Sequence, residues 1–221
     1  MIGIHGMMRW LYRRVRVASE GWTFVLPLAG ATVLSALVGW WGVAGLGLVL
    51  TVGVALFFRD PERIIPQTPE TIVSPADGRV VEIVPENAQT RRISIFLSLW
   101  DVHINRAPYG GVVRSVVYTP GKFLAAYRQE ASWVNEANTI TIAEHGREFI
   151  VKQIAGVLAR RIVCRVRPGD TLDKGQRYGL IRFGSRTDLL LPATAEIAVQ
   201  VGDVVKGGET ILAFLKEPPG A

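Results

Sequence analysis

The longest hydrophobic segment of the chain runs from Gly21 to Phe58 and contains no Asp, Glu, Lys, Arg or His. At about 1.5 Å per residue, one helix of this length would reach roughly 57 Å, almost twice the ~30 Å hydrocarbon core of a bilayer. Two helices fit better, with a break at Gly39-Trp40-Trp41-Gly42, because glycines loosen a helix and indoles suit a headgroup-level turn. The pattern predicts a membrane hairpin over residues 21–58. Whether it spans the membrane or dips into it stays open, since each half is short for a crossing.

The residues on either side of this hairpin are basic. Residues 1–20 mix Arg with aromatic side chains, as an interfacial helix on anionic lipid does. Arg59 and Arg63 flank the other end, so the positive-inside rule places both ends, and everything after them, on the cytoplasmic face of the cell (inner) membrane. A cleaved signal peptide is the alternative, but the run is much too long for one and lacks a small-residue cleavage pattern.

Beyond a linker over residues 59–70, which holds charges and prolines, the pattern becomes β-like. Short β-prone runs are separated by Gly, Pro and Asn. They cover 78–84, 92–99, 111–118, 139–143, 148–154, 161–166, 178–183, 188–191, 196–201 and 210–215. Only residues 121–133 are expected to form a short helix or an irregular active-site loop. The segment 71–221 is long enough to bury its own core and is predicted to be a mostly β domain.

A weak repeat lies in the last third of the chain, where Gly169–Gln176 recurs as Gly202–Glu209. Each copy has Gly-Asp followed by a basic residue and Gly, which is turn chemistry and predicts duplicated hairpins. Such a pair resembles the barrel-sandwich, a β-sandwich-like fold, of biotinyl and lipoyl carrier domains. A membrane-tethered carrier module without catalysis is therefore one functional hypothesis. Lys174 would be its modified residue, although the following Gly175 favours a plain turn.

Charge and cysteine content narrow the function classes. The net charge of +6 and the pI of about 9.8 fit a protein held against an acidic membrane surface. No nucleic-acid recognition motif accompanies the charge, so no nucleic-acid partner is expected. Cys164 is the only cysteine, which excludes an internal disulfide and offers no metal cluster. It is interpreted as a small apolar residue of a strand.

Candidate chemistry centres on Gly184-Ser185, which joins two strand-like runs. Gly-Ser is also a common turn dipeptide, so a tight corner is the alternative. A nucleophilic hydroxyl needs a base and a group that orients the base. The sequence must therefore supply both for Ser185 to act.

The chain has three histidines from which to choose the base. His5 lies in the N-terminal tail and His145 at an expected hairpin tip, so neither is expected to do chemistry. His103 follows a hydrophobic strand directly, where loop groups held by a scaffold often act. Asp77 is the best candidate for the orienting carboxylate, although Asp77-Gly78 also suits a turn.

Together these residues lie in segments that occur in the order seen in one family. The segments are 57–63, 74–78, 101–108, 135–136 and 182–186. The whole chain, hairpin included, resembles the short, membrane-anchored phosphatidylserine decarboxylases, a type that includes archaetidylserine decarboxylases. The resemblance implies cleavage between Gly184 and Ser185, which gives a large chain (1–184) and a small chain (185–221). Ser185 would become an N-terminal pyruvoyl cofactor.

The resemblance also implies a reaction. The pyruvoyl ketone condenses with the amine of phosphatidylserine and accepts the electrons released as carbon dioxide leaves, in place of pyridoxal phosphate. Phosphatidylethanolamine is the product. The exact serine phospholipid, phosphatidylserine or archaetidylserine, stays open. The resemblance also implies a possible homodimer, because the family favours dimers.

The sequence departs from the longer family members at two places. They carry Leu-Gly-Ser-Thr where this chain has residues 183–186, and a second histidine where it has Arg106. In them the histidine matching Arg106 is placed in the cleavage triad and the one matching His103 in decarboxylation. Arginine cannot act as a base, because its pKa stays above about 12. His103, oriented by Asp77, is therefore expected to serve both steps.

Arg106 is expected to hold the phosphate or carboxylate of the substrate, with a surface ion pair as the alternative. Asn135 and Glu136 match a substrate-proximal loop of the family. Three aromatic residues precede them and would either contact lipid chains or cover the sheet: Phe123, Tyr127 and Trp133.

Overall fold

The computed structural model describes residues 16–126, 128, 130–157, 161–182 and 185–216. It divides into two compact units, with the boundary between Glu62 and Arg63, inside the segment 59–70. His5, Tyr127, Phe183 and Gly184 lie outside the described residues.

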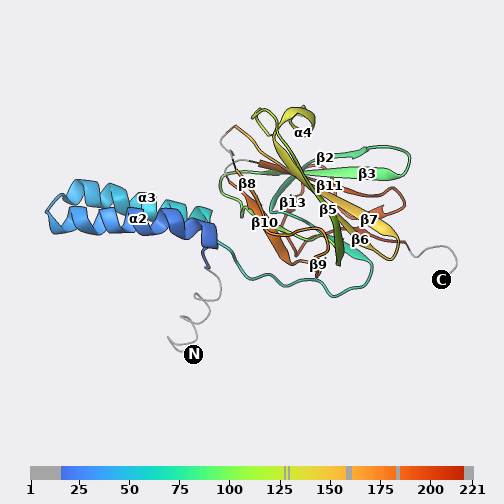
Figure 1. The fold of residues 1–221 in the computed structure, drawn as a ribbon, viewed down its shortest axis with the longest axis horizontal. Helices are drawn as coiled ribbons and strands as arrows, with labels where there is room; N and C mark the ends of the chain where they lie inside the picture. The colour runs from blue at the N-terminus through green and yellow to red at the C-terminus, as the bar shows by residue number, and fades with distance from the viewer. Residues whose placement is uncertain (1–15, 127, 129, 158–160, 183–184, 217–221) are drawn as a thin grey trace. The chain divides into compact units, whose positions relative to one another are not determined.

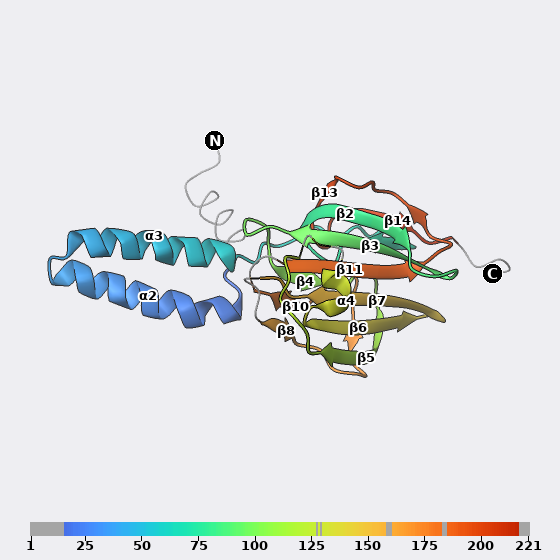
Figure 2. The ribbon, with the colours of Figure 1, turned by 90° about the horizontal axis from the view of Figure 1, so that it is seen from above.

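The first unit is a hairpin of two antiparallel helices, α2 (Ser19–Leu37) and α3 (Trp41–Phe57), which lie side by side (Figures 1 and 2). They turn at Gly39, whose φ of 79° lies in the left-handed region. They approach closely at Gly47, where a Cβ would lie 2.5 Å from the Thr32 hydroxyl oxygen. The predicted helical hairpin is confirmed.

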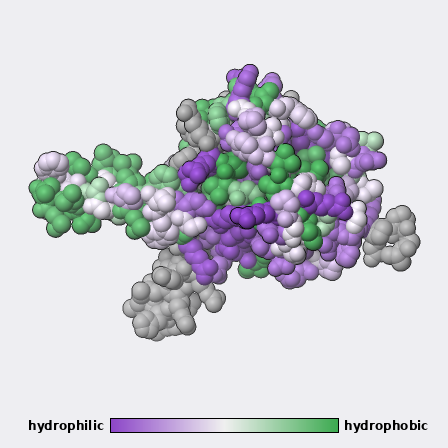
Figure 3. Space-filling model, viewed as in Figure 1, coloured by the Kyte–Doolittle hydropathy of each residue, from purple (hydrophilic) through white to green (hydrophobic). Residues whose placement is uncertain are grey.

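The hairpin is apolar on its outside. Large exposed hydrophobic side chains follow both helices, and the hairpin surface in Figure 3 is largely hydrophobic. By length and composition α2 could cross a membrane, whereas α3, with 17 residues, is shorter. These features support membrane association of the N-terminal segment.

The second unit is mostly β, as predicted, with all strand pairs antiparallel. A curled eight-stranded sheet, most of whose strands are labelled in Figure 1, has the order β13-β2-β3-β11-β7-β6-β5-β9. Two three-stranded sheets have the orders β1-β14-β12 and β4-β10-β8. The strands are β1 (Thr71–Val73), β2 (Gly78–Pro85), β3 (Thr90–Leu97), β4 (Ile104–Arg106), β5 (Gly111–Thr119), β6 (Ala137–Glu144), β7 (Arg147–Ile154), β8 (Ile162–Cys164), β9 (Thr171–Leu172), β10 (Arg177–Ile181), β11 (Ser185–Pro192), β12 (Glu196–Ile197), β13 (Val204–Val205) and β14 (Ile211–Phe214).

One hydrophobic core draws on all three sheets. Alternate residues of the large sheet point into it, such as Ile93 and Ile95 on β3 and Leu189 and Leu191 on β11. This period of two is what a strand with one buried face requires. Cys164, on β8, packs at the edge of this core, half-buried, as expected of a small apolar residue.

The repeat produces two equivalent edges of the large sheet. Asp170 accepts a hydrogen bond from the Arg167 N–H (2.8 Å), and Asp203 accepts one from the Gln200 N–H (2.9 Å). The short strands that follow, β9 and β13, pair with β5 and β2. The predicted duplication is therefore confirmed, and its copies close opposite edges of one sheet.

The main differences from the sequence pattern concern polar strand residues. The pattern predicts a strand only from Asp188, whereas β11 begins at Ser185. Arg186 and Thr187 hide this start, because their side chains are buried by polar contacts and break the hydrophobic alternation. Most of the 121–133 segment is irregular where described, and its one helix is α4 (Ala131–Val134).

The Gly111→Ala change tests a close backbone contact between the paired strands β5 and β6. Gly111 has a φ of 147°, and a Cβ there would lie 2.6 Å from the Ala143 carbonyl oxygen. We expect the change to lower the free energy of unfolding by about 2–4 kcal/mol, from backbone strain and this clash. Gly146→Ala is the control, because Gly146 has a φ of 76° but open space around it, and should cost only about 1 kcal/mol. Denaturant unfolding measures both, and equal losses would contradict the expectation.

Candidate active site

The candidate residues gather at one end of three neighbouring strands. Ser185, the first residue of β11, pairs with Leu97, the last residue of β3. On the next strand, β2, Arg79 pairs with Phe96, so Asp77 and Gly78 lie at the same end. Two strand spacings of about 5 Å separate β2 from β11, which leaves room for a side chain between Asp77 and Ser185.

Ser185 is fully buried, and its hydroxyl has no hydrogen-bond partner among the residues that the structure describes. The alternation of β11 places Ser185 on the same face as Thr187 and the core residue Leu189. The hydroxyl therefore faces the interior of the domain. A buried polar group of this kind calls for a chemical or structural explanation.

His103 lies just before β4 and reaches the same end of the domain through β10. Its carbonyl oxygen accepts a hydrogen bond from the N–H of Ile181 (3.2 Å), the last residue of β10, and Ser185 follows shortly in the chain. The side chain is 2% exposed, and Nδ1 lies 2.9 Å from the Asp101 carbonyl oxygen. A carbonyl only accepts, so Nδ1 carries the hydrogen and the lone pair of a neutral ring is on Nε2.

Asp77 is held by partners from other parts of the chain. Its Oδ2 accepts a hydrogen bond from Arg63 Nη2 (2.7 Å), and its Oδ1 accepts one from the Gly207 N–H (2.8 Å). Burial raises the pKa of the Asp77 carboxyl, and the Arg63 guanidinium and the Gly207 amide offset only part of this rise. A carboxyl in this setting is the type of group that functional sites perturb.

Sequence reasoning missed two residues that shape this site. Arg63, 7% exposed, is the ionic partner of Asp77, and the charge cluster at 59–63 gave the only signal for it. Asp101 accepts hydrogen bonds from the N–H (2.8 Å) and the hydroxyl (2.6 Å) of Ser98. These bonds close the loop that carries His103.

A chain of buried side-chain hydrogen bonds lines the same face. Asn138 donates to Gln153 (3.0 Å), Gln153 to Asn105 (2.9 Å), and Asn105 to the Thr187 hydroxyl (3.1 Å). All four residues are at most 5% exposed and come from four strands, β6, β7, β4 and β11. Buried amides that are mutually bonded hold one arrangement, so the wall beside Ser185 is fixed.

Arg106 is on β4 but is bound away from the surface. It is 5% exposed, and its Nη1 donates to the Gly175 carbonyl oxygen (3.0 Å). Its aliphatic part lies against Gly208. Burial therefore places the Arg106 side chain away from the surface.

Asn135 and Glu136 form the base of the loop that precedes β6. Asn135 bonds the N–H and the carbonyl of Leu124 (2.9 and 2.8 Å) and the carbonyl of Ala155 (2.8 Å). Glu136 pairs with the Lys122 backbone. Trp133, 65% exposed, lies over the cations of Arg92 and Lys152. These residues brace and cover the sheet.

His145 and Lys174, the remaining candidates, have positions that suit turn residues. His145 lies at the exposed tip of the β6–β7 hairpin, as predicted. Lys174 donates to the Thr68 carbonyl and the Thr71 hydroxyl (both 2.9 Å), so its amine is tied to the domain and does not project for modification. Within the described part of the chain, no three His, Cys, Asp or Glu side chains could hold a metal ion.

The fold and the site define a class: a mostly β domain built round a buried serine and preceded by an apolar helical hairpin. The sequence model of one family, described as phosphatidylserine decarboxylase, matches residues 50–213. The chain therefore belongs to the phosphatidylserine decarboxylase family, and it is an enzyme of the carboxy-lyase class.

Curated relatives match over nearly their full lengths. The phosphatidylserine decarboxylase proenzyme of Geotalea uraniireducens is 44% identical over 205 residues, which cover 90% of this chain and 96% of that protein. That of Symbiobacterium thermophilum is 47% identical over 217 residues (93% and 98%), and that of Cereibacter sphaeroides is 47% identical over 206 residues (89% and 88%). The resemblance inferred from the separated motifs is confirmed.

The Arg63→Gln change tests the electrostatics of Asp77. Because the Arg63 charge lowers the pKa of Asp77, its removal should raise that pKa further. Carboxyl NMR titration of the chain measures the shift. Arg63→Lys keeps the charge and should show a smaller rise. An unchanged Asp77 pKa in Arg63→Gln would show that the pair does not control the carboxyl.

Proposed function

We propose that this proenzyme cleaves itself between Gly184 and Ser185, converts Ser185 into a pyruvoyl cofactor, and decarboxylates phosphatidylserine to phosphatidylethanolamine and carbon dioxide. The observation that supports this best is the fully buried Ser185 hydroxyl, which has no hydrogen-bond partner among the described residues. Leaving a buried hydroxyl unpaired costs about 1–3 kcal/mol. A nucleophile poised for one reaction explains why this cost is accepted.

In the proposed cleavage, the Ser185 oxygen bonds to the carbonyl carbon of Gly184 as the peptide C–N bond breaks, so an ester replaces the amide. Loss of the Ser185 Cα proton then expels Gly184 as a carboxylate. Water replaces the nitrogen, which leaves as ammonia. One water enters and one ammonia leaves, with no oxidant or reductant.

His103 is the proposed base for the first step, since Nε2 carries the lone pair when Nδ1 donates to the Asp101 carbonyl. Asp77 is proposed to stabilise the imidazolium that forms through its negative charge, and not through the Nδ1 hydrogen bond of a serine triad, because Nδ1 donates to the Asp101 carbonyl. The ionised form of Asp77 is held by Arg63 and the Gly207 amide, which keep it at the same strand ends as Ser185.

A pyruvoyl ketone supplies an electron sink for the pair released when an α-amino acid loses carbon dioxide. The residues around position 185 supply a dry, fixed surrounding, because His103, Asn105 and Thr187 are all at most 2% exposed. His103 is then proposed to deliver the proton that takes the place of carbon dioxide on the substrate Cα. One imidazole would thus serve both steps.

Other family-matched residues have secondary proposed roles. Arg106, three positions after His103, is proposed to attract the phosphate or carboxylate of the substrate from its buried place on β4. Asn135 and Glu136 are proposed to act through the loop base that they brace. The proposed location is the cytoplasmic face of the cell membrane, because Arg59 and Arg63 follow the apolar hairpin.

Ser185→Ala is the direct test of self-cleavage. The unaltered protein should separate on denaturing electrophoresis into residues 1–184 and 185–221, whereas Ser185→Ala should stay a single, inactive chain because it lacks the attacking oxygen. Ser115→Ala is the control, since this partly buried serine lies on β5, where its hydroxyl bonds Thr141, and it should be processed normally. Processing of Ser185→Ala would show that another bond is cut.

His103→Ala tests the double role of the imidazole. Removal of a general base should slow self-cleavage by about 10²–10⁴-fold, as followed by electrophoresis over time. Carbon dioxide release from phosphatidylserine should fall similarly in whatever fraction is processed. His145→Ala, at an exposed hairpin tip, is the control and should match the parent. Rapid cleavage of His103→Ala would assign the cleavage base to another group.

A further inference from the structure

Arg186, the residue after Ser185, has no role in the chemistry proposed above, yet its side chain is 1% exposed. Successive residues of a strand point to opposite faces. Ser185 faces the core side of the large sheet, and Arg186 faces the other side, which α4 covers. A buried guanidinium needs paired anions, so its partners show what it holds.

The Arg186 guanidinium bonds to three strands. Nη2 donates to Glu82 Oε2 on β2 (2.7 Å) and to Ser94 Oγ on β3 (2.6 Å), and Nε donates to Asp188 Oδ1 on β11 (2.7 Å). Charge-assisted bonds of this length are the stronger kind, and several of them fix a planar guanidinium in orientation as well as position. Arg186 therefore ties the start of β11 to the neighbouring strands β2 and β3.

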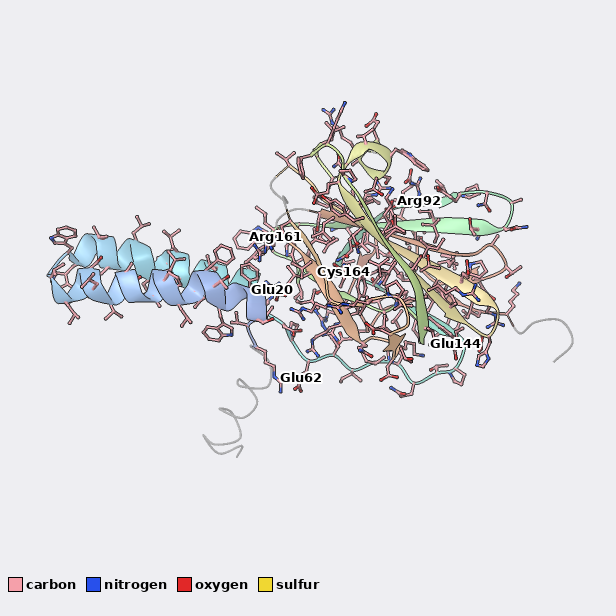
Figure 4. The ribbon with its side chains drawn as sticks, in the orientation of Figure 1. Glu20, Glu62, Arg92, Glu144, Arg161 and Cys164 are labelled. Carbon is pink, nitrogen blue, oxygen red and sulfur yellow. The ribbon has the colours of Figure 1, made fainter. Side chains whose placement is uncertain are left out.

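A second arginine shares the same carboxylates. Arg92 is on β3 (Figure 4). It lies 3.2 Å from Glu82, 3.3 Å from Glu86 and 3.8 Å from Asp188. Ser132 of α4 donates to the other oxygen of Asp188 (2.7 Å). Trp133 covers Arg92, with its ring 5.2 Å from the guanidinium carbon. The charges of this outer cluster are thus satisfied and shielded.

We propose that Arg186 is a positioning residue that holds the new N-terminal end of the small chain in the active site after cleavage. This inference rests on the proposed function. Cleavage at Gly184-Ser185 would put Arg186 and Asp188 on the small chain, and Glu82 and Ser94 on the large chain. The bonds of Arg186 would then cross the cut.

Backbone pairing alone holds this end weakly. Ser185 pairs with Leu97 on β3, but the ladder with β7 starts only at Arg186 and Ile154. Once the peptide bond before Ser185 is gone, residue 185 is the free end of a strand, and strand ends fray. Among the described residues, the Arg186 side chain is the first after the cut to be fixed by side-chain hydrogen bonds, so it sets where the ketone of residue 185 lies.

The inference predicts a specific defect in Arg186→Gln. Misplacement of a reacting group by about 1 Å can cost 10²-fold in rate. We expect kcat for decarboxylation to fall by about tenfold to a hundredfold with KM little changed, since substrate binding does not involve this side chain. Self-cleavage should fall less, because before cleavage Ser185 is held from both sides.

A second readout reports the cofactor position without turnover. A water-soluble hydrazide reacts with an accessible ketone, and mass spectrometry of the small chain measures its rate of labelling. A frayed end should make Arg186→Gln label several-fold faster than the parent. Arg186→Lys keeps the charge but loses the planar set of donors of the guanidinium, so its labelling rate should lie between those of the parent and Arg186→Gln.

Arg92→Gln is the matched control, because it removes the same charge from the same cluster but leaves the hydrogen bonds of Arg186 itself in place. It should keep parental kcat and labelling. Completed self-cleavage shows that a variant has folded. If Arg186→Gln is not cleaved, the inference is tested with Glu82→Gln, which removes one large-chain partner of Arg186. Its kcat and its labelling rate are then measured in the same way.

Parental kcat and labelling in the processed Arg186→Gln enzyme, or equal defects in Arg186→Gln and Arg92→Gln, would overturn the inference. If Arg186→Gln is not cleaved, parental kcat and labelling in Glu82→Gln would overturn the inference. A parent protein that neither cleaves nor decarboxylates would instead overturn the proposed function on which the inference rests.

Discussion

The register of β11 between β3 and β7 is the constraint on which the site depends. Pairing Ser185 with Leu97 turns the serine toward the core and turns Arg186 toward the outer charge cluster. A slip of one residue would exchange the two faces, turning the hydroxyl toward the outer charge cluster and the guanidinium toward apolar side chains. The placements of the proposed nucleophile, Ser185, and of the proposed positioning residue, Arg186, are therefore consequences of one pairing.

Burial is the common feature of the candidate residues. Ser185, the His103 imidazole, the Thr187 hydroxyl and a chain of amides are all at most 5% exposed. Electrostatic interactions are stronger there than in water, and burial itself raises the pKa of Asp77. Membership of the phosphatidylserine decarboxylase family fits a site that needs a dry, pre-arranged surrounding.

Hydrophobic patterning predicted the helical hairpin, most of the strands and the duplicated sheet edges, because those elements bury one apolar face. It missed the start of β11, where Arg186 and Thr187 are buried by polar contacts that no periodicity reveals. Ser185, His103 and Asp77 could be chosen from local context and resemblance. The Arg63–Asp77 pair and the Asn105–Gln153 bond join residues distant in sequence, so only the folded chain brings them together.

The central claim is that Ser185 is the precursor of the cofactor, and the intact mass of the small chain tests it most directly. The account predicts a fragment of residues 185–221 that is lighter by one ammonia than the same peptide beginning with serine. Reduction with borohydride should add two hydrogens to its terminal ketone. A purified, active enzyme that retains the mass of the complete 221-residue chain, or a fragment with N-terminal serine, would contradict the account.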